Sequence, residues 1–335
     1  MTELVDNLDL GRAKPGELYR CRVAIVENGL AEPIWIPVIV ARGIRPGPVV
    51  GFTAAMHGNE LNGVRVIHKL LEELKDEVRD LSGTIVAVPV VNVPGFLNAH
   101  REYSDGIDLN RVMPGKSKGN TSEVYASRFI KRIVRHFDYL IDLHTASFGR
   151  VNSLYVRADM QDSICRKLAL LQCPQIIVHN KGKDGTLRSA AAQLGIPSIT
   201  VEVGNPQLFQ RKLIRFSLVG IHNILSYLNM IPADPDEPQE TPVICRKSQW
   251  IYTDVGGLLN IPVEITQRVE RKQLIGRVHN VFGDLVKKFF APEAGIVVGK
   301  STNPVAQSGA RVVHLGDVAD EGEFPSEVWS PPDLD

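Results

Sequence analysis

Short apolar runs rich in β-branched residues recur along the chain from about residue 20 onward. Each run is bounded by Gly or Pro, as in WIPVIVA (35–41), PVVGFTAA (48–55) and GTIVAVPVV (83–91). Runs of this kind are typical of strands buried on both faces. Between the last two runs, apolar residues recur at helical spacing while Lys and Glu occupy the other face: Val66, Leu70, Leu71 and Leu74. The pattern predicts a strand, helix, strand unit.

The same alternation continues toward residue 230. It predicts helices near 121–136, 160–171, 186–194 and 207–229, and strands at YLIDLH (139–144), near 175–179 and at SITVEV (198–203). Strands that alternate with helices favour an α/β fold, with a mostly parallel or mixed sheet covered by helices on both faces. Such sheets bind ligands at the carboxyl ends of their strands, so we expect the functional residues directly after strands.

The composition and periodicity of the sequence change near residue 231, which predicts a domain boundary there. The segment IPADPDEPQETP (231–242) is rich in Pro and acidic residues and has no periodicity, which is typical of a linker. From about 245 to 318 the sequence shows short strands and Gly turns without a helical pattern. We predict a catalytic domain over 1–231 with an N-terminal extension, a linker over 232–244, a small β-domain over 245–320 and an acidic tail over 321–335.

Charge and composition narrow the range of partners. Lys plus Arg number 38 and Asp plus Glu number 38, so no global basic field favours nucleic acid or an anionic membrane. The N-terminus lacks the features of a signal peptide, and no stretch reaches the roughly 18–20 apolar residues of a membrane span. The four cysteines include no CxxC pair, which argues against a zinc knuckle or a disulfide framework. We expect a soluble cytoplasmic protein with reduced thiols.

Residues that can bind a metal follow two of the predicted strands. His57 and Glu60, in the sequence HGNE, come directly after an apolar run, and His144 closes the strand YLIDLH. Two His and one carboxylate make an open set of three zinc ligands that leaves a fourth position for water. A single His after a strand is more often a capping or core residue, so the prediction rests on the conjunction of all three. We predict one zinc ion per chain at these residues.

Glu202 stands inside the apolar strand SITVEVG. A carboxylate in such a run is costly unless it is paired or functional. Beside a zinc-bound water it can take the proton as that water attacks a carbonyl; the alternative is a structural carboxylate satisfied within the sheet. A polar loop carries Asn110 and Arg111, which suit a carboxylate because guanidinium offers a planar fork and the amide adds a donor. The alternative there is a solvated loop charge.

Four motifs, taken in order, resemble the succinylglutamate desuccinylase and aspartoacylase family: HGNE (57–60), DLNR (108–111), DLH (142–144) and TVEVG (200–204). This family shares its catalytic fold with the zinc carboxypeptidases. The resemblance covers roughly residues 45–230 through these motifs, and the β-rich region from 245 to 318 is similar to the small C-terminal domain of the family. As a set, the motifs are quite specific.

The resemblance implies a role for each matched residue. Zinc would be bound by His57, Glu60 and His144, and the substrate carboxylate by Asn110 and Arg111. Glu202 would activate water and then protonate the leaving amine.

Three further residues match the family less closely. Arg101 corresponds to the arginine that polarises the scissile carbonyl and stabilises its oxyanion. Arg188 resembles another arginine that holds a substrate carboxylate, but GIPS (195–198) lengthens its gap to Glu202, so a charge on the helix face is the alternative. The substrate tyrosine of the family's C-terminal domain has no secure counterpart, and Tyr252 is the nearest candidate.

The resemblance implies a zinc-dependent hydrolase that cleaves the amide bond of an N-acylated amino acid or related small amine. A carboxypeptidase acting on a peptide C-terminus would use the same metal and base but needs an open groove. In the family's deacylases the C-terminal domain often narrows the entrance to the pocket, so a long β-domain favours small substrates. An inactive protein that binds a small carboxylate is the hypothesis from another class, and its mark would be a lost ligand or base. No nucleic-acid or membrane partner is expected, and the sequence is compatible with a homo-oligomer.

Overall fold

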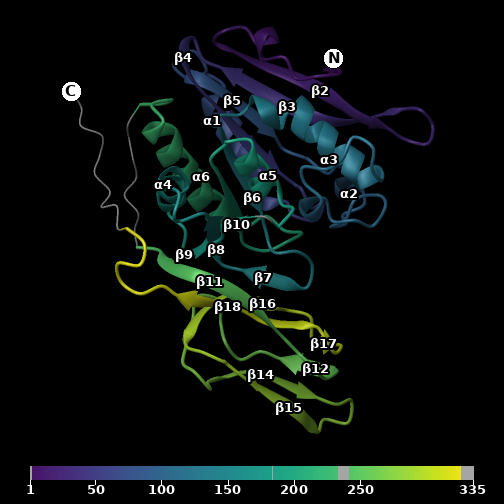
Figure 1. The fold of residues 1–335 in the computed structure, drawn as a ribbon, viewed down its shortest axis with the longest axis vertical. Coiled ribbons are helices and arrows are strands. Elements are labelled where there is room, and N and C mark those ends of the chain that lie inside the picture. Colours follow the sequence, from purple (N-terminus) through teal and green to yellow (C-terminus); the bar gives the residue numbers. More distant parts are fainter. Residues whose placement is uncertain (1, 183, 233–240, 326–335) are drawn as a thin grey trace.

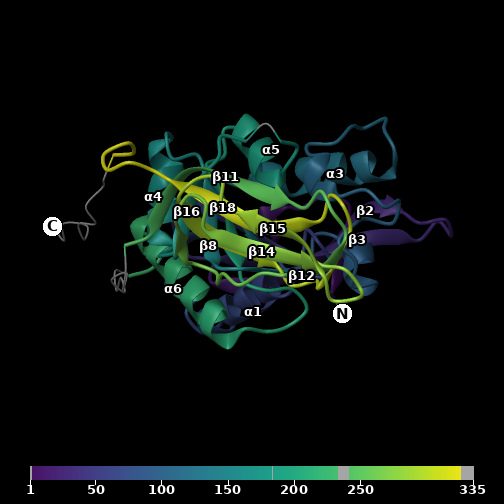
Figure 2. The ribbon, with the colours of Figure 1, turned by 90° about the horizontal axis from the view of Figure 1, so that it is seen from below.

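The structure is a computed structural model and describes residues 2–182, 184–232 and 241–325. Within these ranges the chain forms a mixed sheet of fourteen strands with helices on both faces, and a separate four-stranded sheet (Figure 1). Figure 2 views the molecule from the side of the small sheet, so that β12, β14 and β15 lie nearest to the reader. The predicted α/β class, with a mostly parallel or mixed sheet, is confirmed.

The middle of the chain forms the centre of the large sheet. From edge to edge its strands are β1 (Glu3–Val5), β2 (Glu17–Glu27), β3 (Pro33–Arg42), β5 (Ser82–Val88), β4 (Arg45–Ala54), β6 (Tyr139–His144), β10 (Ser198–Val203), β8 (Leu154–Ala158), β9 (Ile176–His179), β11 (Val243–Tyr252), β18 (Arg311–Val318), β16 (Gly295–Ser301) and β13 (Arg268–Val269), and β7 (Arg150–Asn152) pairs with β16. β5, β4, β6 and β10 are parallel neighbours. β8 runs antiparallel to β10 and makes the centre of the sheet mixed.

The strands that the sequence predicts are present, and two of them, β6 and β10, have the predicted bounds. Their apolar runs end sharply at polar residues or Gly, which marks the boundaries clearly. The sequence does not predict β8, because Tyr155 and Arg157 interrupt its apolar pattern. Both side chains face the same side of the strand.

Helices pack on both faces of the large sheet. α1 (Asn62–Leu74), α4 (Ser163–Leu171) and α6 (Arg211–Tyr227) share one apolar core, whereas α3 (Thr121–Arg132) and α5 (Leu187–Gln193) share another. The connections include α2 (Val93–Leu97) and the 3-10 turns η1 (Leu10–Arg12), η2 (Leu109–Arg111) and η3 (Val134–His136). All five predicted helices are present but shorter than predicted. Side-chain caps explain two late starts, since Asp162 and Thr186 accept from the first turns of α4 and α5.

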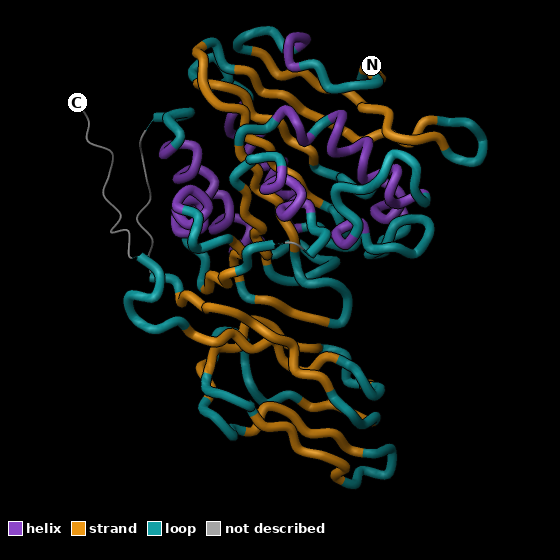
Figure 3. The backbone as a smooth tube through the Cα atoms, viewed as in Figure 1, coloured by secondary structure: helices purple, strands orange, loops and turns teal. Residues whose placement is uncertain are grey.

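The C-terminal strands divide between the two sheets. β11, β13, β16 and β18 extend the large sheet, while β12 (Gly257–Asn260), β14 (Leu274–His279), β15 (Leu285–Phe290) and β17 (Val305–Ala306) form the small one. Figure 3 shows only strand and loop in this described part of the chain. The predicted linker lies mostly outside the described residues, and its last residues, 243–244, begin β11. Residues 326–335 of the predicted tail also lie outside, so the domain bounds stay a prediction.

The structure also bears on the predictions about membrane-spanning helices and cysteines. Among the described helices, none is long and apolar enough to cross a bilayer. All four cysteines are free, and Cys21, Cys165 and Cys245 are buried. Burial raises the pKa of Cys165 to about 12, so this thiol stays protonated at neutral pH.

Candidate metal centre

The carboxyl ends of β4, β6 and β10 lie side by side in the large sheet, which is where an α/β sheet places its site. His144 ends β6 and lies opposite Glu202 in the parallel register of β6 and β10. β4 pairs with the other edge of β6, and the segment after β4 carries His57 and Glu60. Segments far apart in the sequence therefore bring these four residues together.

A tight turn after β4 positions His57 and Glu60. The Glu60 N–H donates to the His57 carbonyl at 3.1 Å, and α1 starts at Asn62. Gly58 lets this turn approach the backbone of α2, because a Cβ at this position would lie 2.0 Å from the carbonyl carbon of Gly95. Packing therefore requires the glycine of HGNE, while His57 and Glu60 on either side of it are the candidate metal ligands.

The three predicted ligands form a compact buried cluster. His57 Nδ1 lies 2.8 Å from Glu60 Oε1, and His144 Nδ1 lies 3.0 Å from Glu60 Oε2. One ligand atom from each residue lies within 4.8 Å of the others, and the residues are only 2–3% exposed. Burial alone would raise the pKa of Glu60, but the two histidines outweigh it and hold that pKa well below its usual range. Two imidazoles and a charged carboxylate suit a divalent metal ion.

Two carboxylates bind the imidazole nitrogens that face away from the cluster. His57 Nε2 lies 3.0 Å from Asp108 Oδ1, and His144 Nε2 lies 2.8 Å from Asp142 Oδ2. Metal-binding histidines commonly donate their second N–H to a carboxylate, which fixes the tautomer and the ring orientation. The arrangement leaves both Nδ1 atoms directed toward Glu60, as a shared metal site requires.

The sequence alone predicts no role for Asp108 or Asp142. A signal exists for Asp142, because residues two apart in a strand face the same side and Asp142 precedes His144 by two positions. Burial opposes a charge on His144, but Asp142 and then Glu60 outweigh it and raise the pKa of His144 well above its usual range. Asp108 belongs to the DLNR motif, but its contact with His57 depends on the loop conformation.

The structure brings Arg101 to the same cluster. Its Nε and Nη2 donate to Asp108 Oδ2 at 3.1 and 2.8 Å. Its Nη1 donates to Glu60 Oε1 at 3.3 Å and to Ser147 Oγ. Ser147 in turn donates to Glu60 Oε1 at 2.5 Å. Asp108 therefore holds one edge of the guanidinium, and the remaining nitrogen, Nη1, is directed toward Glu60.

Glu202 is half-buried on β10, and residues of β7 and β8 lie around it. Asn152 of β7 donates to Glu202 Oε2 at 3.2 Å. Tyr155 of β8 lies opposite Glu202 in the antiparallel register, and Arg157 donates to the Tyr155 hydroxyl at 2.9 Å. Burial raises the pKa of Glu202, although His144 opposes this shift. A carboxyl group with a raised pKa is suited to exchange protons near neutral pH.

Asn110 and Arg111 belong to the 3-10 turn η2, which rests on the segment before α5. The Leu187 N–H, at the start of α5, donates to Asn110 Oδ1 at 2.8 Å. The Met113 N–H donates to the Gly185 carbonyl at 2.9 Å. Arg111 is exposed, and no ion pair of its side chain occurs among the described residues.

Arg188 is a buried cation on α5. It is 3% exposed, and its Nη1 and Nη2 donate to the carbonyl and the side-chain oxygen of Asn180 at 2.9 and 2.6 Å. Its guanidinium is therefore held inside the protein, and the assignment of Arg188 to a substrate carboxylate stays a prediction. Burial lowers the pKa of Arg188. The hydrogen bond from Leu187 to Asn110 places Asn110 beside the start of α5, the helix that carries Arg188.

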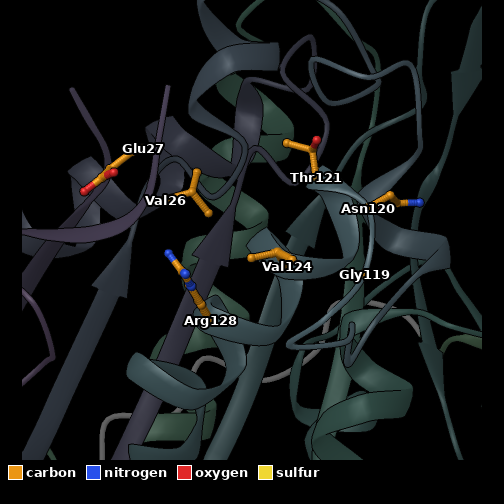
Figure 4. Close-up of a pocket in the computed structure, with 7 residues that line it drawn as sticks. All are labelled: Val26, Glu27, Gly119, Asn120, Thr121, Val124 and Arg128. Carbon is orange, nitrogen blue, oxygen red and sulfur yellow. The ribbon is translucent and has the colours of Figure 1, made fainter. Parts of the chain in front are cut away.

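A hollow of about 420 Å³ opens elsewhere, between β2 and the start of α3. Seven residues line it: Val26, Glu27, Gly119, Asn120, Thr121, Val124 and Arg128 (Figure 4). Arg128 already donates to the Ile25 carbonyl at 2.9 Å, and these seven include none of the predicted site residues. The chemistry therefore points to the His-Glu-His cluster and not to this hollow.

Comparison with known families agrees with this geometry. The model of the succinylglutamate desuccinylase/aspartoacylase catalytic domain matches residues 46–228, more than half of the chain. The chain belongs to this family. The resemblance carried by HGNE, DLNR, DLH and TVEVG is therefore confirmed.

Similar proteins extend the likeness over most of the chain. An N-alpha-acetyl-L-2,4-diaminobutyric acid deacetylase from Halomonas elongata is 24% identical over 303 residues, which cover 86% of this chain and 87% of the relative. A succinylglutamate desuccinylase from Silicibacter sp. aligns with a TM-score of 0.81 at 19% identity, covering 93% of this chain and 97% of that one. The product-bound ectoine utilization protein from Ruegeria pomeroyi gives 0.81 at 20% identity, covering 92% and 97%. The C-terminal strands are thus part of a shared fold.

Proposed function

We propose that this protein is a zinc-dependent deacylase that hydrolyses the amide bond of an N-acylated amino acid or a related small amine. The observation that carries the proposal is the buried cluster of His57, Glu60 and His144 beside Glu202. Family membership supports a deacylase, and the name of the Halomonas relative states removal of an acetyl group from an amino-acid amine.

The three ligands would hold one zinc ion, which when bound supplies a Lewis acid that polarises a carbonyl and lowers the pKa of water. Asp108 and Asp142 would keep the ligand imidazoles in one tautomer and one orientation. Arg101 Nη1 would stabilise negative charge on the carbonyl oxygen of the substrate, because Asp108 already fixes the other edge of its guanidinium.

Glu202 would act as general base and then as general acid. Its carboxylate takes a proton from the attacking water, and the carboxyl group then returns that proton to the leaving nitrogen. Asn152 supports this role, since it holds Glu202 Oε2 and so limits the rotation of the carboxylate. The raised pKa of Glu202 favours the second step, because the protonated form becomes easier to populate.

Asn110, Arg111 and Arg188 would bind the carboxylate of the amino-acid part. The amide of Asn110 keeps its nitrogen for a substrate because its oxygen accepts from Leu187. Arg111 contributes an exposed guanidinium, which can pair bidentately with a carboxylate. We keep a cytoplasmic location, a small-molecule substrate and the absence of nucleic-acid and membrane partners as predictions.

The experiment that tests the proposal is a screen of N-acylated amino acids and short peptides with zinc-loaded protein, in which release of free amine is measured. Chelated protein and chelated protein reloaded with zinc serve as controls. We expect turnover of acylated amino acids that is lost on chelation and restored by zinc. Release of C-terminal residues from peptides alone would identify a carboxypeptidase, and substrate binding without turnover would identify an inactive binding protein. Either result would contradict the proposal.

A further inference from the structure

Tyr155, on β8, has no assigned role and lies directly beside Glu202. In the antiparallel register of β8 and β10, Tyr155 lies opposite Glu202, and Arg157 lies opposite Thr200. Residues two apart in a strand face the same side, so Tyr155 and Arg157 share the face of the sheet that carries Glu202. Tyr155 is only 2% exposed, and a buried phenolic hydroxyl needs hydrogen-bond partners inside the protein.

The donors and acceptors around Tyr155 direct its hydroxyl proton toward Glu202. Arg157 Nη2 donates to the Tyr155 hydroxyl oxygen at 2.9 Å. A guanidinium has donors but no acceptor, so the hydroxyl must donate to another group. Burial raises the pKa of Tyr155, Arg157 opposes this shift, and a hydrogen bond with Glu202 adds to it. The hydroxyl therefore keeps its proton at neutral pH and donates a hydrogen bond to the Glu202 carboxylate.

Arg157 supplies the positive charge of this arrangement. Its side chain is half-buried, and the guanidinium carbon lies 5.2 Å from the centroid of the Tyr155 ring. Burial lowers the pKa of Arg157, but Tyr155 and Glu202 outweigh this effect and raise that pKa. Within the part of the chain that the structure describes, no ion pair joins Arg157 directly to Glu202. The hydroxyl therefore links the cation to the carboxylate, and it donates more strongly because it accepts a charged hydrogen bond itself.

The C-terminal strands hold the Tyr155 ring in place. The His314 ring of β18 meets the Tyr155 ring at 6.0 Å in an edge contact and stacks on Trp250 at 5.0 Å. Its Nε2 lies 2.8 Å from Ser248 Oγ, and the residue is 2% exposed. Burial lowers the pKa of His314 well below its usual range, and nearby arginines lower it further. His314 is therefore a neutral, fixed ring that supports Tyr155 without adding a charge beside Glu202.

Asn152 and Tyr155 give Glu202 two donors from two strands. Asn152 of β7 donates to Glu202 Oε2 at 3.2 Å. It lies opposite Gly299 of β16, where a Cβ would lie 2.4 Å from Asn152 Oδ1. Gly299 therefore leaves room for the amide that contacts Glu202. An ionised carboxylate offers about four acceptor positions, so two donors fix its orientation and leave positions for the attacking water.

We propose that Tyr155 and Arg157 are positioning residues for Glu202: Arg157 orients the Tyr155 hydroxyl, which donates to the carboxylate and holds it for proton exchange with water. The proposal rests on the deacylase function proposed above and adds two residues that act through its general base. It also gives the C-terminal strands a part in the reaction, because His314 fixes the ring that carries the hydroxyl.

Tyr155→Phe in the zinc-loaded enzyme tests the positioning role, because this change removes the hydroxyl and keeps the ring. With the acylated amino acid that the screen above selects, we expect kcat to fall by about tenfold, since a hydrogen bond to a charged group is lost. KM and zinc content should stay within about twofold of wild type, because the hydroxyl acts on Glu202 and not on substrate binding. Tyr227→Phe, at the exposed end of α6, is the matched control.

Two further comparisons separate positioning from a general loss of structure. In the Glu202→Gln background, Tyr155→Phe should change the single-turnover rate by less than about twofold, because a residue that acts through Glu202 has no base left to position. With Glu202 in place, Arg157→Met should lower kcat by about tenfold. Arg157→Lys should keep most of the wild-type rate, since lysine retains a charged donor.

Tyrosine absorption in the near ultraviolet provides a readout that does not depend on turnover. Glu202→Gln exchanges a charged acceptor for a neutral one, so we expect it to shift the tyrosine band, and this shift should be absent when Tyr155 is replaced by Phe. If no substrate is hydrolysed, the deacylase function fails, while the difference spectrum still decides whether Tyr155 holds Glu202.

Three results would refute the positioning role. The first is that Glu202→Gln causes no shift of the tyrosine band, or a shift that persists with Tyr155→Phe. The second is that folded Tyr155→Phe or Arg157→Met protein keeps the wild-type kcat. The third is that Tyr155→Phe lowers the rate equally in the wild-type and Glu202→Gln backgrounds, which would make its effect independent of the base.

Discussion

Replacing Asp142 by Asn should weaken metal binding without removing a ligand. Asp142 is fully buried, its Oδ2 lies 2.8 Å from His144 Nε2, and Thr53 donates to its Oδ1 at 2.6 Å. Asn has nearly the same shape, and its single oxygen can still accept from His144 while its nitrogen donates to Thr53. The change therefore removes the negative charge behind His144 and leaves the packing in place.

The size of the effect follows from how such carboxylates act. Carboxylates that accept from the second N–H of a metal-binding histidine raise the basicity of its imidazole and fix its orientation. Their loss typically weakens metal affinity by about 10–100-fold. That range corresponds to about 1.4–2.7 kcal/mol. We expect the upper half of the range, because Asp142 is 0% exposed and solvent cannot screen its interaction with His144.

The assay is a competition between the metal-free protein and a chromophoric chelator for zinc. Asp76→Asn is the matched control, because this carboxylate is exposed and its nearest cation, Lys75, is 3.8 Å away. Circular dichroism and thermal unfolding would check that the Asp142→Asn protein is folded. A folded variant that binds zinc within twofold of wild type would refute the claim that Asp142 orients His144 for a metal.

Two further predictions concern chemistry and substrate binding. Glu202→Gln should retain zinc and the fold but lower kcat by about 10²–10⁴. Single-turnover kinetics and metal analysis on the same preparation check this. A variant that melts early yet turns over substrate at the wild-type rate would show that Glu202 is a structural carboxylate. Arg111→Ala should raise KM for carboxylate-bearing substrates by about tenfold, since a charged hydrogen bond is lost at an exposed residue; an unchanged KM across such substrates would exclude the assigned role.

The positions of the candidate ligands have a sequence signal because they follow clear apolar runs. β6 and β10 end in YLIDLH and SITVEV, and both bounds are confirmed. The rule that sites occur at the carboxyl ends of parallel strands then brings His144 and Glu202 together. Sequence spacing cannot give their register, however, and the pairing of His144 with Glu202 is a finding of the structure.

The residues around the ligands were harder to predict. β8 carries polar side chains on its buried face, so Tyr155 and Arg157 conceal a central strand. Arg188 has the sequence pattern of a surface helix residue, yet Asn180 binds its guanidinium in the interior. In each case a long-range partner overrides the local pattern.

The packing of Arg311 in the C-terminal strands has no local sequence signal. A bulge between β11 and β18 accompanies the packing of Arg311 over Trp250 and Tyr252, and a bulge cannot be seen in the spacing of apolar residues. Tyr252 is 51% exposed and lies under Arg311, so the nearest candidate for the family tyrosine is paired with a cation in this structure. Pairing between distant strands alone creates this juxtaposition.

We propose that one metal ion at His57, Glu60 and His144 supports amide hydrolysis. The most direct test is a zinc titration of the metal-free protein in which bound zinc and amine release are measured in the same samples. We predict that both rise together and level off at one zinc per chain, and that the double variant His57→Ala/His144→Ala shows neither. Full zinc binding by the double variant, or wild-type hydrolysis that continues without metal, would contradict this proposal.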